Sequence, residues 1–292
     1  MKQYQIPLLS VFLLLTACAA PTPQAQLSTN LPSPTDPPLL PAATPQAPTE
    51  VSKPTVTATE YVPSHPVILT DSLQPGQTAY AFLSSTGVEV RYLIYLPEKY
   101  DPDKEWPLIV FLAGSDGRGS NIDRLINLPP HNYVEDLADF PFIIVTPQLA
   151  DGFWPKLIDP IDELLDHLIK VLPIDANRLY LTGYSLGGNG TWKYALKYPD
   201  RFAAIAPIAG GPSVSTDRVP EDICTLKELP IWAIHGAEDT GVPPEQSIEP
   251  VDALEACGAD VKLTLYPDTG HDAWTPTYSD LAFYEWLLAQ SK

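Results

Sequence analysis

One serine of this chain stands between glycines at the point where an apolar run gives way to a helical pattern. Ser185 lies in the segment 183–187, GYSLG, which has the form G-x-S-x-G. Between a strand and a helix this pattern holds the serine in a strained turn with its hydroxyl exposed, because the small glycines let both elements approach closely. The amino end of the helix directs partial positive charge to the point where a tetrahedral oxyanion would form. The pattern also occurs in simple glycine-rich turns, but its place after a strand predicts that Ser185 is a nucleophile in acyl transfer.

A serine nucleophile needs a histidine base within hydrogen-bond reach. His271 stands in the segment 268–272, DTGHD, between the last predicted strand and the final predicted helix. That loop would return over the carboxyl edge of the sheet, so His271 is the predicted base. His235 follows an apolar strand and is predicted to be a packed turn residue. The remaining histidines lie in a proline-rich segment, in a loop and on a helix: His65, His131 and His167.

The base needs a carboxylate that orients it. Asp239 follows the apolar run 231–235 by a short turn and is the predicted partner. Glu238 would point elsewhere if that turn is regular, and Asp217 and Asp272 are further alternatives. With Asp239 the chain order is serine, aspartate, histidine, which is the order in hydrolases whose nucleophile sits on such a turn.

Two backbone amides are predicted to bind the oxyanion. One belongs to Leu186, the residue after the nucleophile, and the other to the turn 113–119, AGSDGRG, which follows the apolar run 108–112. Ser115 is the predicted donor in that turn and Gly114 is the alternative. Its position at the carboxyl end of a strand favours this role over that of a flexible glycine loop.

The segments around these residues alternate between strands and helices. An antiparallel hairpin is predicted from residues 78–83 and 88–96, at one edge of a sheet. Further strand-length apolar runs follow at 106–112, 142–146, 178–182, 202–208, 231–235 and 261–266. Helical spacing of apolar residues appears at 161–172, after Ser185, and at 279–289. The pattern predicts one α/β domain with a mostly parallel sheet and helices on both faces, and its connections are too short for a large cap domain.

The composition of the chain changes sharply before that domain. All 16 glycines lie at or after Gly76, whereas the segment from Ala19 to Pro66 holds 12 of the 34 prolines and only four charged residues. Such a segment buries too little apolar surface to offset the entropy of ordering it. Residues 19–70 are therefore predicted to be a semi-extended tether and residues 71–292 the folded domain.

Residues 1–18 have the features of a signal peptide. Lys2 precedes an apolar run, Ile6–Leu15, that is too short to span a bilayer. The run ends in LTAC, at residues 15–18, which resembles the bacterial lipobox. The resemblance implies that Cys18 becomes lipidated and anchors the protein to a membrane of the cell envelope. An ordinary secretory signal with an incidental cysteine is the alternative, and both place the domain outside the cytoplasm.

Two cysteines, Cys224 and Cys257, remain in the folded part. Outside the cytoplasm a disulfide between them would persist, and two buried free thiols are the alternative. Neither cysteine has a partner at metal-ligand spacing, so the sequence predicts no metal and no cofactor. The formal net charge of −19 would repel a polyphosphate backbone and argues against nucleic-acid binding.

Five short motifs occur together and in order. They are FLAG with Arg118-Gly119, TPQ followed by Trp154, GYSLGG, HGAED with Val242-Pro243, and GHDAW, which begin at residues 111, 146, 183, 235 and 270. Over about residues 77–292 the chain thereby resembles the secreted α/β-hydrolase esterases grouped with polyhydroxybutyrate depolymerases, feruloyl and acetyl esterases and predicted peptidases. The resemblance implies the α/β-hydrolase fold and a triad of Ser185, Asp239 and His271. Ala113 departs from it, because that family usually has a histidine there, and this puts the rigidity of the loop in question.

Aromatic residues beside these motifs are candidates for substrate binding, since aromatic faces stack on feruloyl groups and sugar rings. They are Phe153, Trp154, Tyr184 and Trp274, and packing in the core is the alternative role for each. The predicted function is a serine carboxylic-ester hydrolase that acts through an acyl-enzyme on extracytoplasmic esters, with carbohydrate-linked acyl or feruloyl esters as candidates. A serine peptidase of the same fold and a non-catalytic, surface-tethered binding protein are the alternatives.

Overall fold

The computed structural model describes residues 73–134, 137, 140–213 and 218–292, and all of them belong to one compact unit, Glu60–Lys292. The predicted signal peptide, the lipidation at Cys18 and the tether lie outside the described residues. Within the described ranges no helix is both long and apolar enough to cross a membrane.

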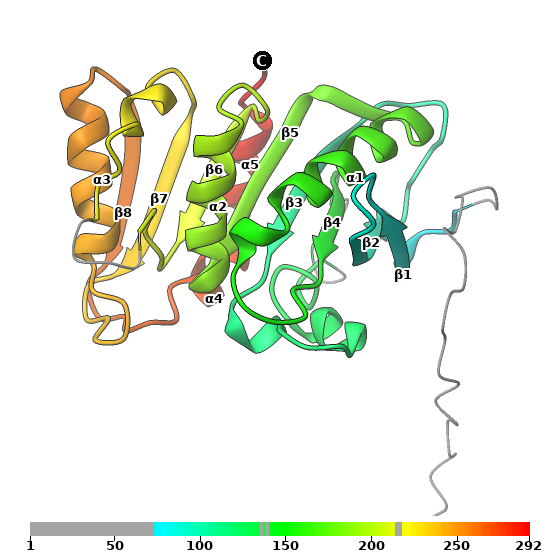
Figure 1. The fold of residues 1–292 in the computed structure, drawn as a ribbon, viewed down its shortest axis with the longest axis horizontal. Coiled ribbons are helices and arrows are strands. Elements are labelled where there is room, and N and C mark those ends of the chain that lie inside the picture. Colours follow the sequence, from blue (N-terminus) through cyan, green and yellow to red (C-terminus); the bar gives the residue numbers. More distant parts are fainter. Residues whose placement is uncertain (1–72, 135–136, 138–139, 214–217) are drawn as a thin grey trace, which may run out of the picture. The chain divides into compact units, whose positions relative to one another are not determined.

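The described domain is built on an eight-stranded sheet with the order β1-β2-β4-β3-β5-β6-β7-β8 (Figure 1). The strands are β1 Gly76–Leu83, β2 Glu89–Leu96, β3 Trp106–Leu112, β4 Ile143–Pro147, β5 Ile174–Tyr184, β6 Ala204–Ile208, β7 Ile231–Gly236 and β8 Val261–Tyr266. β1 and β2 form the predicted antiparallel hairpin at the edge, and β2 also pairs with β4 antiparallel. All remaining pairs are parallel.

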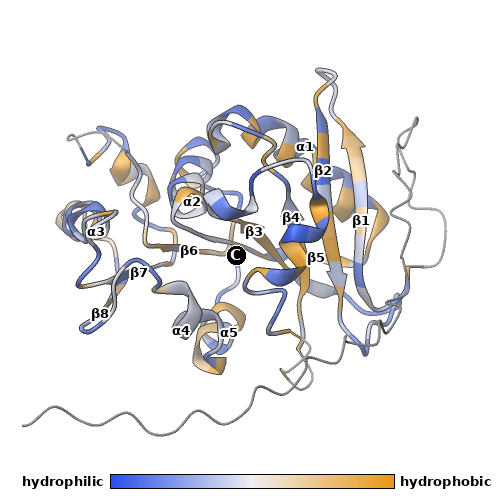
Figure 2. Ribbon diagram, turned by 90° about the horizontal axis from the view of Figure 1, so that it is seen from below, coloured by the Kyte–Doolittle hydropathy of each residue, from blue (hydrophilic) through white to orange (hydrophobic). Residues whose placement is uncertain are grey.

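The central strands are buried on both faces, which explains why their sequences are continuous apolar runs. Residues 107–112 of β3 and all of β4 and β6 are buried. Parallel strands are covered by helices on each side, so a polar residue on either face would lose its contact with water. Figure 2 shows the hydrophobic colouring of these strands between the helical layers.

Helices cover both faces of the sheet, as predicted (Figures 1 and 2). The helices α1 Ile158–Val171, α2 Leu186–Lys197 and α3 Glu245–Ala256 pack on one face, where Leu164, Trp192 and Leu254 join one buried cluster. The helices α4 Trp274–Tyr278 and α5 Leu281–Leu288 pack on the other, where Tyr278 and Leu287 join a second cluster. Short 3₁₀ turns lie in the connections: η1 Ser115–Gly117, η2 Ile122–Asn127, η3 Trp154–Lys156 and η4 Ile223–Leu226.

Helix α3 was not predicted from the sequence. Pro250 lies inside it, and proline removes a backbone donor and normally interrupts a helix. The packing of α3 against the domain offsets the cost of this proline, because Val251 and Leu254 are buried on the inner face of the helix. Cys257, which caps this helix, forms a disulfide with Cys224 of η4, with the two Cα atoms 5.8 Å apart. The structure therefore has the disulfide rather than two free thiols.

The register of the sheet brings four loops to one edge. Leu112 of β3 pairs with Gly183 of β5, so the loops after these strands begin side by side. In the same way Gly236 of β7 pairs with Tyr266 of β8. The carboxyl ends of parallel strands meet at one edge of a sheet, so the loops after β3, β5, β7 and β8, which carry the predicted oxyanion and triad residues, all start there.

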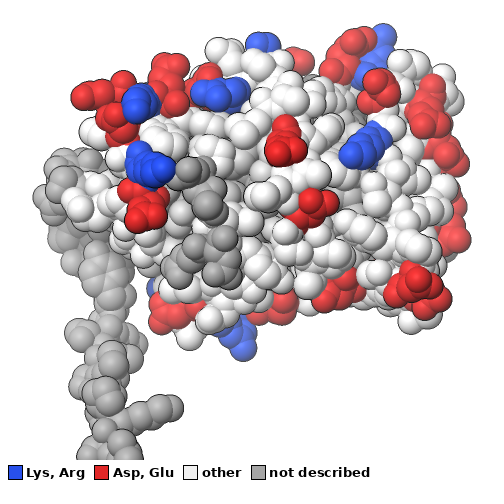
Figure 3. Space-filling model, turned by 180° about the vertical axis from the view of Figure 1, so that it is seen from behind, with Lys and Arg blue, Asp and Glu red and all other residues white. Residues whose placement is uncertain are grey.

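The surface of the domain is strongly acidic, in line with the net charge of −19. On the face seen from behind, Asp and Glu side chains lie around the rim and near the middle, and Lys and Arg side chains are less frequent (Figure 3).

Candidate active site

Ser185 occupies the turn between β5 and α2 with an unusual backbone conformation. Its φ is 54° and its ψ is −116°, which is strained for a residue with a side chain. The turn is held in place because the amide of Ser185 donates to the carbonyl of Ile208 at 2.9 Å. A Cβ atom on Gly187 would lie 1.8 Å from the carbonyl oxygen of Leu112, so only glycine permits this close approach of helix and strand. The sequence motif therefore forms the predicted strand–turn–helix.

Three side chains from three separate loops form one chain of hydrogen bonds. Nε2 of His271 lies 2.9 Å from Oγ of Ser185, and Nδ1 of the same ring lies 2.6 Å from Oδ2 of Asp239. A carboxylate only accepts hydrogen bonds, so Nδ1 carries the proton and Nε2 is left to accept from the serine hydroxyl. The residues named from the sequence thus come together in the predicted order of contacts.

Asp239 is buried and held as a carboxylate by its own turn. Its Oδ1 accepts from the amides of Gly241 and Val242, each at 2.9 Å. Burial alone would raise the pKa of Asp239, but the hydrogen bonds from His271 and from these amides together lower the pKa below its usual range. The side chain is therefore a fixed negative charge behind the imidazole.

The other predicted carboxylates do not take this place. Glu238 is exposed and Oδ1 of Asp272 accepts from the amide of Thr275, while Asp217 lies outside the described residues. Neither His131 nor His167 approaches the serine: His131 is buried beside Thr146, and His167 packs against Phe82.

His235 is packed, as predicted, but it also reaches the site. Its ring is fully buried, with Nδ1 2.7 Å from Oγ of Ser247 and Nε2 2.9 Å from the carbonyl of Val242. Nε2 also lies 3.3 Å from Oδ2 of Asp239. Burial is the main cause that lowers the pKa of His235, so the ring is neutral. No local pattern in the sequence indicates this second contact to the carboxylate.

The turn after β3 lies beside Ser185 and is held by hydrogen bonds from two aromatic side chains. The hydroxyl of Tyr184 donates to Oδ2 of Asp116 at 2.8 Å, and the indole N–H of Trp154 donates to the carbonyl of Ala113 at 3.2 Å. Ala113 is itself buried, in the position where the resembling family usually has a histidine. Two side-chain hydrogen bonds therefore hold the turn that begins at Ala113.

These contacts correct the prediction that Trp154 and Tyr184 line the substrate cleft. Each side chain is 1 % exposed, because the layer beneath the turn after β3 needs large side chains to fill it. Trp274 is half-buried, stacks on Tyr184 with ring centroids 4.3 Å apart and lies edge-on to His271 at 5.1 Å. Phe153 is 51 % exposed, and it does not line the cavity beside Ser185.

A cavity of about 370 Å³ opens beside the serine hydroxyl. Its wall includes Ser185 and Leu186 from the nucleophile turn and Ser115 from the turn after β3. The remaining lining residues come from three loops and two helices: Arg118, Asn189, Gly210, Gly211, Ser213, Gly241, Val242, Pro243 and Gln246. The two predicted oxyanion donors thus border the same space as the nucleophile. Gly114 does not line it, and a Cβ atom there would lie 2.5 Å from the ring of Tyr184.

Several lining residues were not predicted from the sequence. Arg118 belongs to one of the five motifs, but the motif does not indicate a role for its side chain, and no pattern in the sequence marks Asn189 or Gln246. Both lie on helices: Asn189 is in the first turn of α2, which directly follows the cap residue Ser185, and Gln246 is near the start of α3.

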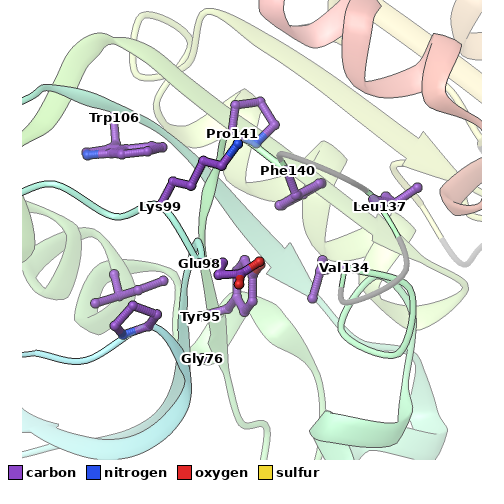
Figure 4. Close-up of a pocket in the computed structure, with 11 residues that line it drawn as sticks. Gly76, Tyr95, Glu98, Lys99, Trp106, Val134, Leu137, Phe140 and Pro141 are labelled. Atoms are coloured by element: carbon purple, nitrogen blue, oxygen red, sulfur yellow. The ribbon is translucent and has the colours of Figure 1, made fainter.

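A second cavity, of about 510 Å³, lies where β3 begins, at the end of the parallel strands opposite to Ser185. Its lining side chains are drawn in Figure 4. It is bordered by the end of β2 and the start of β3, with Tyr95 and Trp106 in its wall. β3 is seven residues long, which at a rise of about 3.3 Å per residue places this cavity roughly 20 Å from the edge that carries Ser185. Its described lining contains none of the predicted site residues.

Comparisons with known proteins agree with the fold and with the motifs. Residues 149–284 match the family described as phospholipase/carboxylesterase. A poly(3-hydroxyoctanoate) depolymerase of Pseudomonas fluorescens is 29 % identical over 204 residues, which cover 59 % of this chain and 72 % of the relative. A protein of Salmonella typhimurium, by name a carboxymethylenebutenolidase, is 38 % identical over 101 residues, and the chain spans only 37 % of the length of that relative.

Solved structures show the same likeness. The crystal structure of a thermostable esterase superposes with a TM-score of 0.62 at 30 % identity, covering 74 % of this chain and 63 % of the other. The feruloyl esterase module from Clostridium thermocellum superposes with a TM-score of 0.56 at 16 % identity, covering 71 % of this chain and 87 % of the module, and this shows the fold alone. The motifs, the parallel sheet and these neighbours agree on one architecture.

Proposed function

We propose that this chain, an esterase-like protein with the α/β-hydrolase fold, is a serine carboxylic-ester hydrolase with Ser185 as its nucleophile. The observation that carries the proposal is the unbroken series of hydrogen bonds from Oγ of Ser185 through the ring of His271 to Oδ2 of Asp239. A serine hydroxyl is inert until a base takes its proton, and this series supplies a base in the required tautomer.

In the first half of the proposed reaction, Oγ of Ser185 attacks the ester carbonyl carbon while Nε2 of His271 takes the hydroxyl proton. The new C–O bond makes a tetrahedral intermediate whose oxygen carries the negative charge. The imidazolium that forms lies against the carboxylate of Asp239, which stabilises it. His271 then gives the proton to the leaving alkoxide, so that the alcohol departs and an acyl-enzyme remains.

In the second half, a water molecule takes the place of the alcohol. His271 removes its proton as it attacks the acyl carbon, and the collapse of the second tetrahedral intermediate returns the proton to Oγ and releases the acid. We assign the oxyanion site to the amides of Leu186 and Ser115, which border the cavity. Backbone amides at these points stabilise the charge only as it develops, which lowers the barrier rather than tightening the binding of the substrate.

For the substrate class we propose an ester that the protein meets outside the cytoplasm, with carbohydrate-linked acyl or feruloyl esters as candidates. Trp274 supports this substrate class, because it is a half-buried aromatic side chain next to His271 on which a feruloyl group or a sugar ring could stack. Replacing Trp274 by alanine is expected to reduce turnover of methyl ferulate more than turnover of an acetate ester. Equal losses on both esters would remove Trp274 from the subsite.

We also propose that Cys18 anchors the protein to a membrane of the cell envelope, on the basis of the LTAC sequence at residues 15–18. Expressed in a bacterial host, the full chain is expected in the membrane fraction, and a Cys18→Ser variant in the soluble one. A Cys18→Ser variant that stays with the membrane would contradict lipid anchoring.

The triad assignment is tested with short p-nitrophenyl esters and a fluorophosphonate probe. Ser185→Ala is expected to lower kcat by more than about 10³-fold and to abolish labelling, and Asp239→Asn to lower kcat by about 10⁴-fold, because His271 then faces a partner that favours the wrong tautomer. Ser279→Ala, a change of the same kind at an exposed position, is the control. Retained turnover in a folded Ser185→Ala protein would refute the proposal, and equal turnover of matched anilides would favour a peptidase.

A further inference from the structure

We infer that the cavity beside Ser185 recognises an ester that also carries a free carboxylate, and that Arg118 is the residue that binds this carboxylate. The inference rests on the proposed ester hydrolysis and names its substrate class. Its starting point is an arginine in the wall of the reaction cavity whose charge has no carboxylate partner among the described residues.

Arg118 ends the 3₁₀ turn that carries Ser115 and lines the same cavity as Ser185. Its side chain is half-buried, and its Nε atom is inaccessible to solvent and has no hydrogen-bond partner among the described residues. A guanidinium group always carries its charge, and leaving part of it buried and unpaired costs free energy. Such a group is expected at a point where a ligand completes the pairing.

The other half-buried arginines of the described domain each have a side-chain partner. Arg178, Arg201 and Arg218 have a carboxylate within 4 Å, and Arg91 donates to the carbonyl of Ser120. The Nε atoms of Arg201 and Arg218 are also buried without a hydrogen-bond partner, so Arg118 differs from these two only in that its guanidinium has no carboxylate within the described part of the chain. Asp116 and Asp239, on two of the loops that line the cavity, already accept hydrogen bonds from other groups. Asp116 accepts from Tyr184 and from a backbone amide, and Asp239 accepts from His271 and from its own turn.

Among the described residues the rest of the wall combines polar side chains with glycines and the apolar side chains of Leu186, Val242 and Pro243, and it includes no Asp or Glu. Oε1 of Gln246 is a second buried atom without a partner in the described structure, and it lies against Gly211. Asn189 already donates its Nδ2 to the carbonyl of Gly211. A hydrocarbon chain in this space would leave the polar atoms of Arg118 and Gln246 unpaired, so the cavity favours a ligand with polar atoms of its own.

A carboxylate is the group that best fits the unpaired guanidinium. Arginine and carboxylate form two parallel charge-assisted hydrogen bonds, which are about twice as strong as neutral ones. The chain has a net charge of −19 and repels anions over most of its surface, so an anionic ester is held only where a cation faces it. Among the described residues of the cavity wall, Arg118 is the one Lys or Arg. The volume of about 370 Å³ suits a small molecule rather than a polymer segment.

The test uses pairs of esters that differ only in the terminal group. Mono-4-nitrophenyl adipate is compared with 4-nitrophenyl hexanoate, which places the carboxylate on the acyl side. Sodium 6-acetoxyhexanoate is compared with hexyl acetate, which places it on the alcohol side. The wild-type protein is expected to prefer one carboxylate ester over its neutral partner by at least tenfold in kcat/KM, and the pair that shows the preference identifies the side of the ester that faces Arg118.

Arg118→Gln is expected to lower kcat/KM for the preferred carboxylate ester by about 10- to 100-fold and to change that for the neutral partner by less than about threefold. Arg118→Lys keeps the charge but loses the planar guanidinium group. Its kcat/KM for the carboxylate ester is expected to lie between those of the wild-type protein and Arg118→Gln. Lys104→Gln removes one positive charge from an exposed site at the other edge of the sheet and serves as the control for overall electrostatics. Equal losses on charged and neutral esters in Arg118→Gln would overturn the inference.

A binding experiment separates this inference from the proposed reaction. Monomethyl adipate and dimethyl adipate are titrated calorimetrically into Ser185→Ala, which cannot form an acyl-enzyme. Binding of the monoester, lost in the Ser185→Ala, Arg118→Gln double variant, would support the carboxylate site even if no ester were turned over. Turnover of neutral esters that depends on Ser185, with no preference for either carboxylate ester and no binding of the monoester, would refute the site and leave ester hydrolysis standing.

Discussion

Nε2 of His235 lies 3.3 Å from Oδ2 of Asp239, the same carboxylate oxygen that accepts the hydrogen bond of the second histidine. Because Nε2 also faces the carbonyl of Val242 at 2.9 Å, it must carry the ring proton, and Nδ1 must accept from Ser247. One neutral, buried ring thus joins β7, the start of α3 and the turn that presents the carboxylate. We describe His235 as a positioning residue, because it acts on the reaction only through Asp239.

Replacing His235 by phenylalanine is expected to lower the free energy of unfolding by about 2 to 4 kcal/mol, because the change leaves the buried hydroxyl of Ser247 and the part-buried carbonyl of Val242 without their partner. We expect kcat to fall about tenfold with KM nearly unchanged. Adding Ser247→Ala should restore part of the stability, since it removes one of the unpaired groups. Urea unfolding and ester kinetics measure both effects, and a double variant no more stable than His235→Phe would contradict this account.

Removing the hydroxyl of Tyr184 is expected to loosen the turn that carries Ser115. Tyr184→Phe leaves Asp116 without the partner that fixes this turn, so kcat/KM for a neutral ester should fall about 3- to 10-fold, in line with one hydrogen bond of about 1 kcal/mol. Tyr194→Phe is the matched control, because Tyr194 makes the same kind of bond, to Asp162, at 2.9 Å. A kinetic loss of the same size in the control would place the effect in overall stability instead.

A side chain at Gly187 is expected to prevent the nucleophile turn from forming. The Cβ atom of Gly187→Ala would lie 1.8 Å from the carbonyl oxygen of Leu112, which is backbone and has no freedom to move away. We expect a loss of more than about 4 kcal/mol in the free energy of unfolding, or no soluble protein. In Gly241→Ala the nearest atom is 3.5 Å away, so its stability should stay within about 1 kcal/mol of wild type. A soluble Gly187→Ala protein with an unchanged urea midpoint would contradict the geometry.

The stability of the protein is expected to fall as the pH drops below about 6.5. Burial lowers the pKa of His131 to about 3, whereas the unfolded chain takes up this proton near the ordinary value of 6.5. The unfolded state therefore binds more protons between pH 6.5 and 3, and mass action favours it as the pH falls. Between pH 7 and pH 5 this residue accounts for about 2 kcal/mol. His131→Gln should show a correspondingly flatter dependence in urea titrations, and an unchanged slope would show that His131 is not the cause.

The elements of the fold differ in how well they could be predicted from the sequence. The strands β3, β4 and β6 could be predicted because burial on both faces demands continuous apolar runs. Helix α3 could not be predicted, since Pro250 opposes helix locally and only the contacts of Val251 and Leu254 with the rest of the domain outweigh it. Local patterns are reliable where local and tertiary preferences agree.

The same division holds at the site. Ser185, Asp239 and His271 could be named because glycine spacing and chain order are visible without coordinates. The roles of Trp154 and Tyr184 could not, because aromatic residues serve equally in a core and in a cleft, and only their burial beneath the turn after β3 separates the two.

The amino-acid sequence by itself determined the alternation of strands and helices, the place of the nucleophile turn and the three residues that meet there. Each of these depends on neighbours in the chain, through periodicity, glycine spacing or the order of motifs. Only the tertiary structure decided how the polar side chains pair. Asp239 contacts a second histidine, whereas among the described residues the guanidinium of Arg118 has no carboxylate and Oε1 of Gln246 has no hydrogen-bond partner. Pairing of side chains across separate loops depends on the register of β3 with β5 and of β7 with β8, and distances of that kind have no counterpart along the chain.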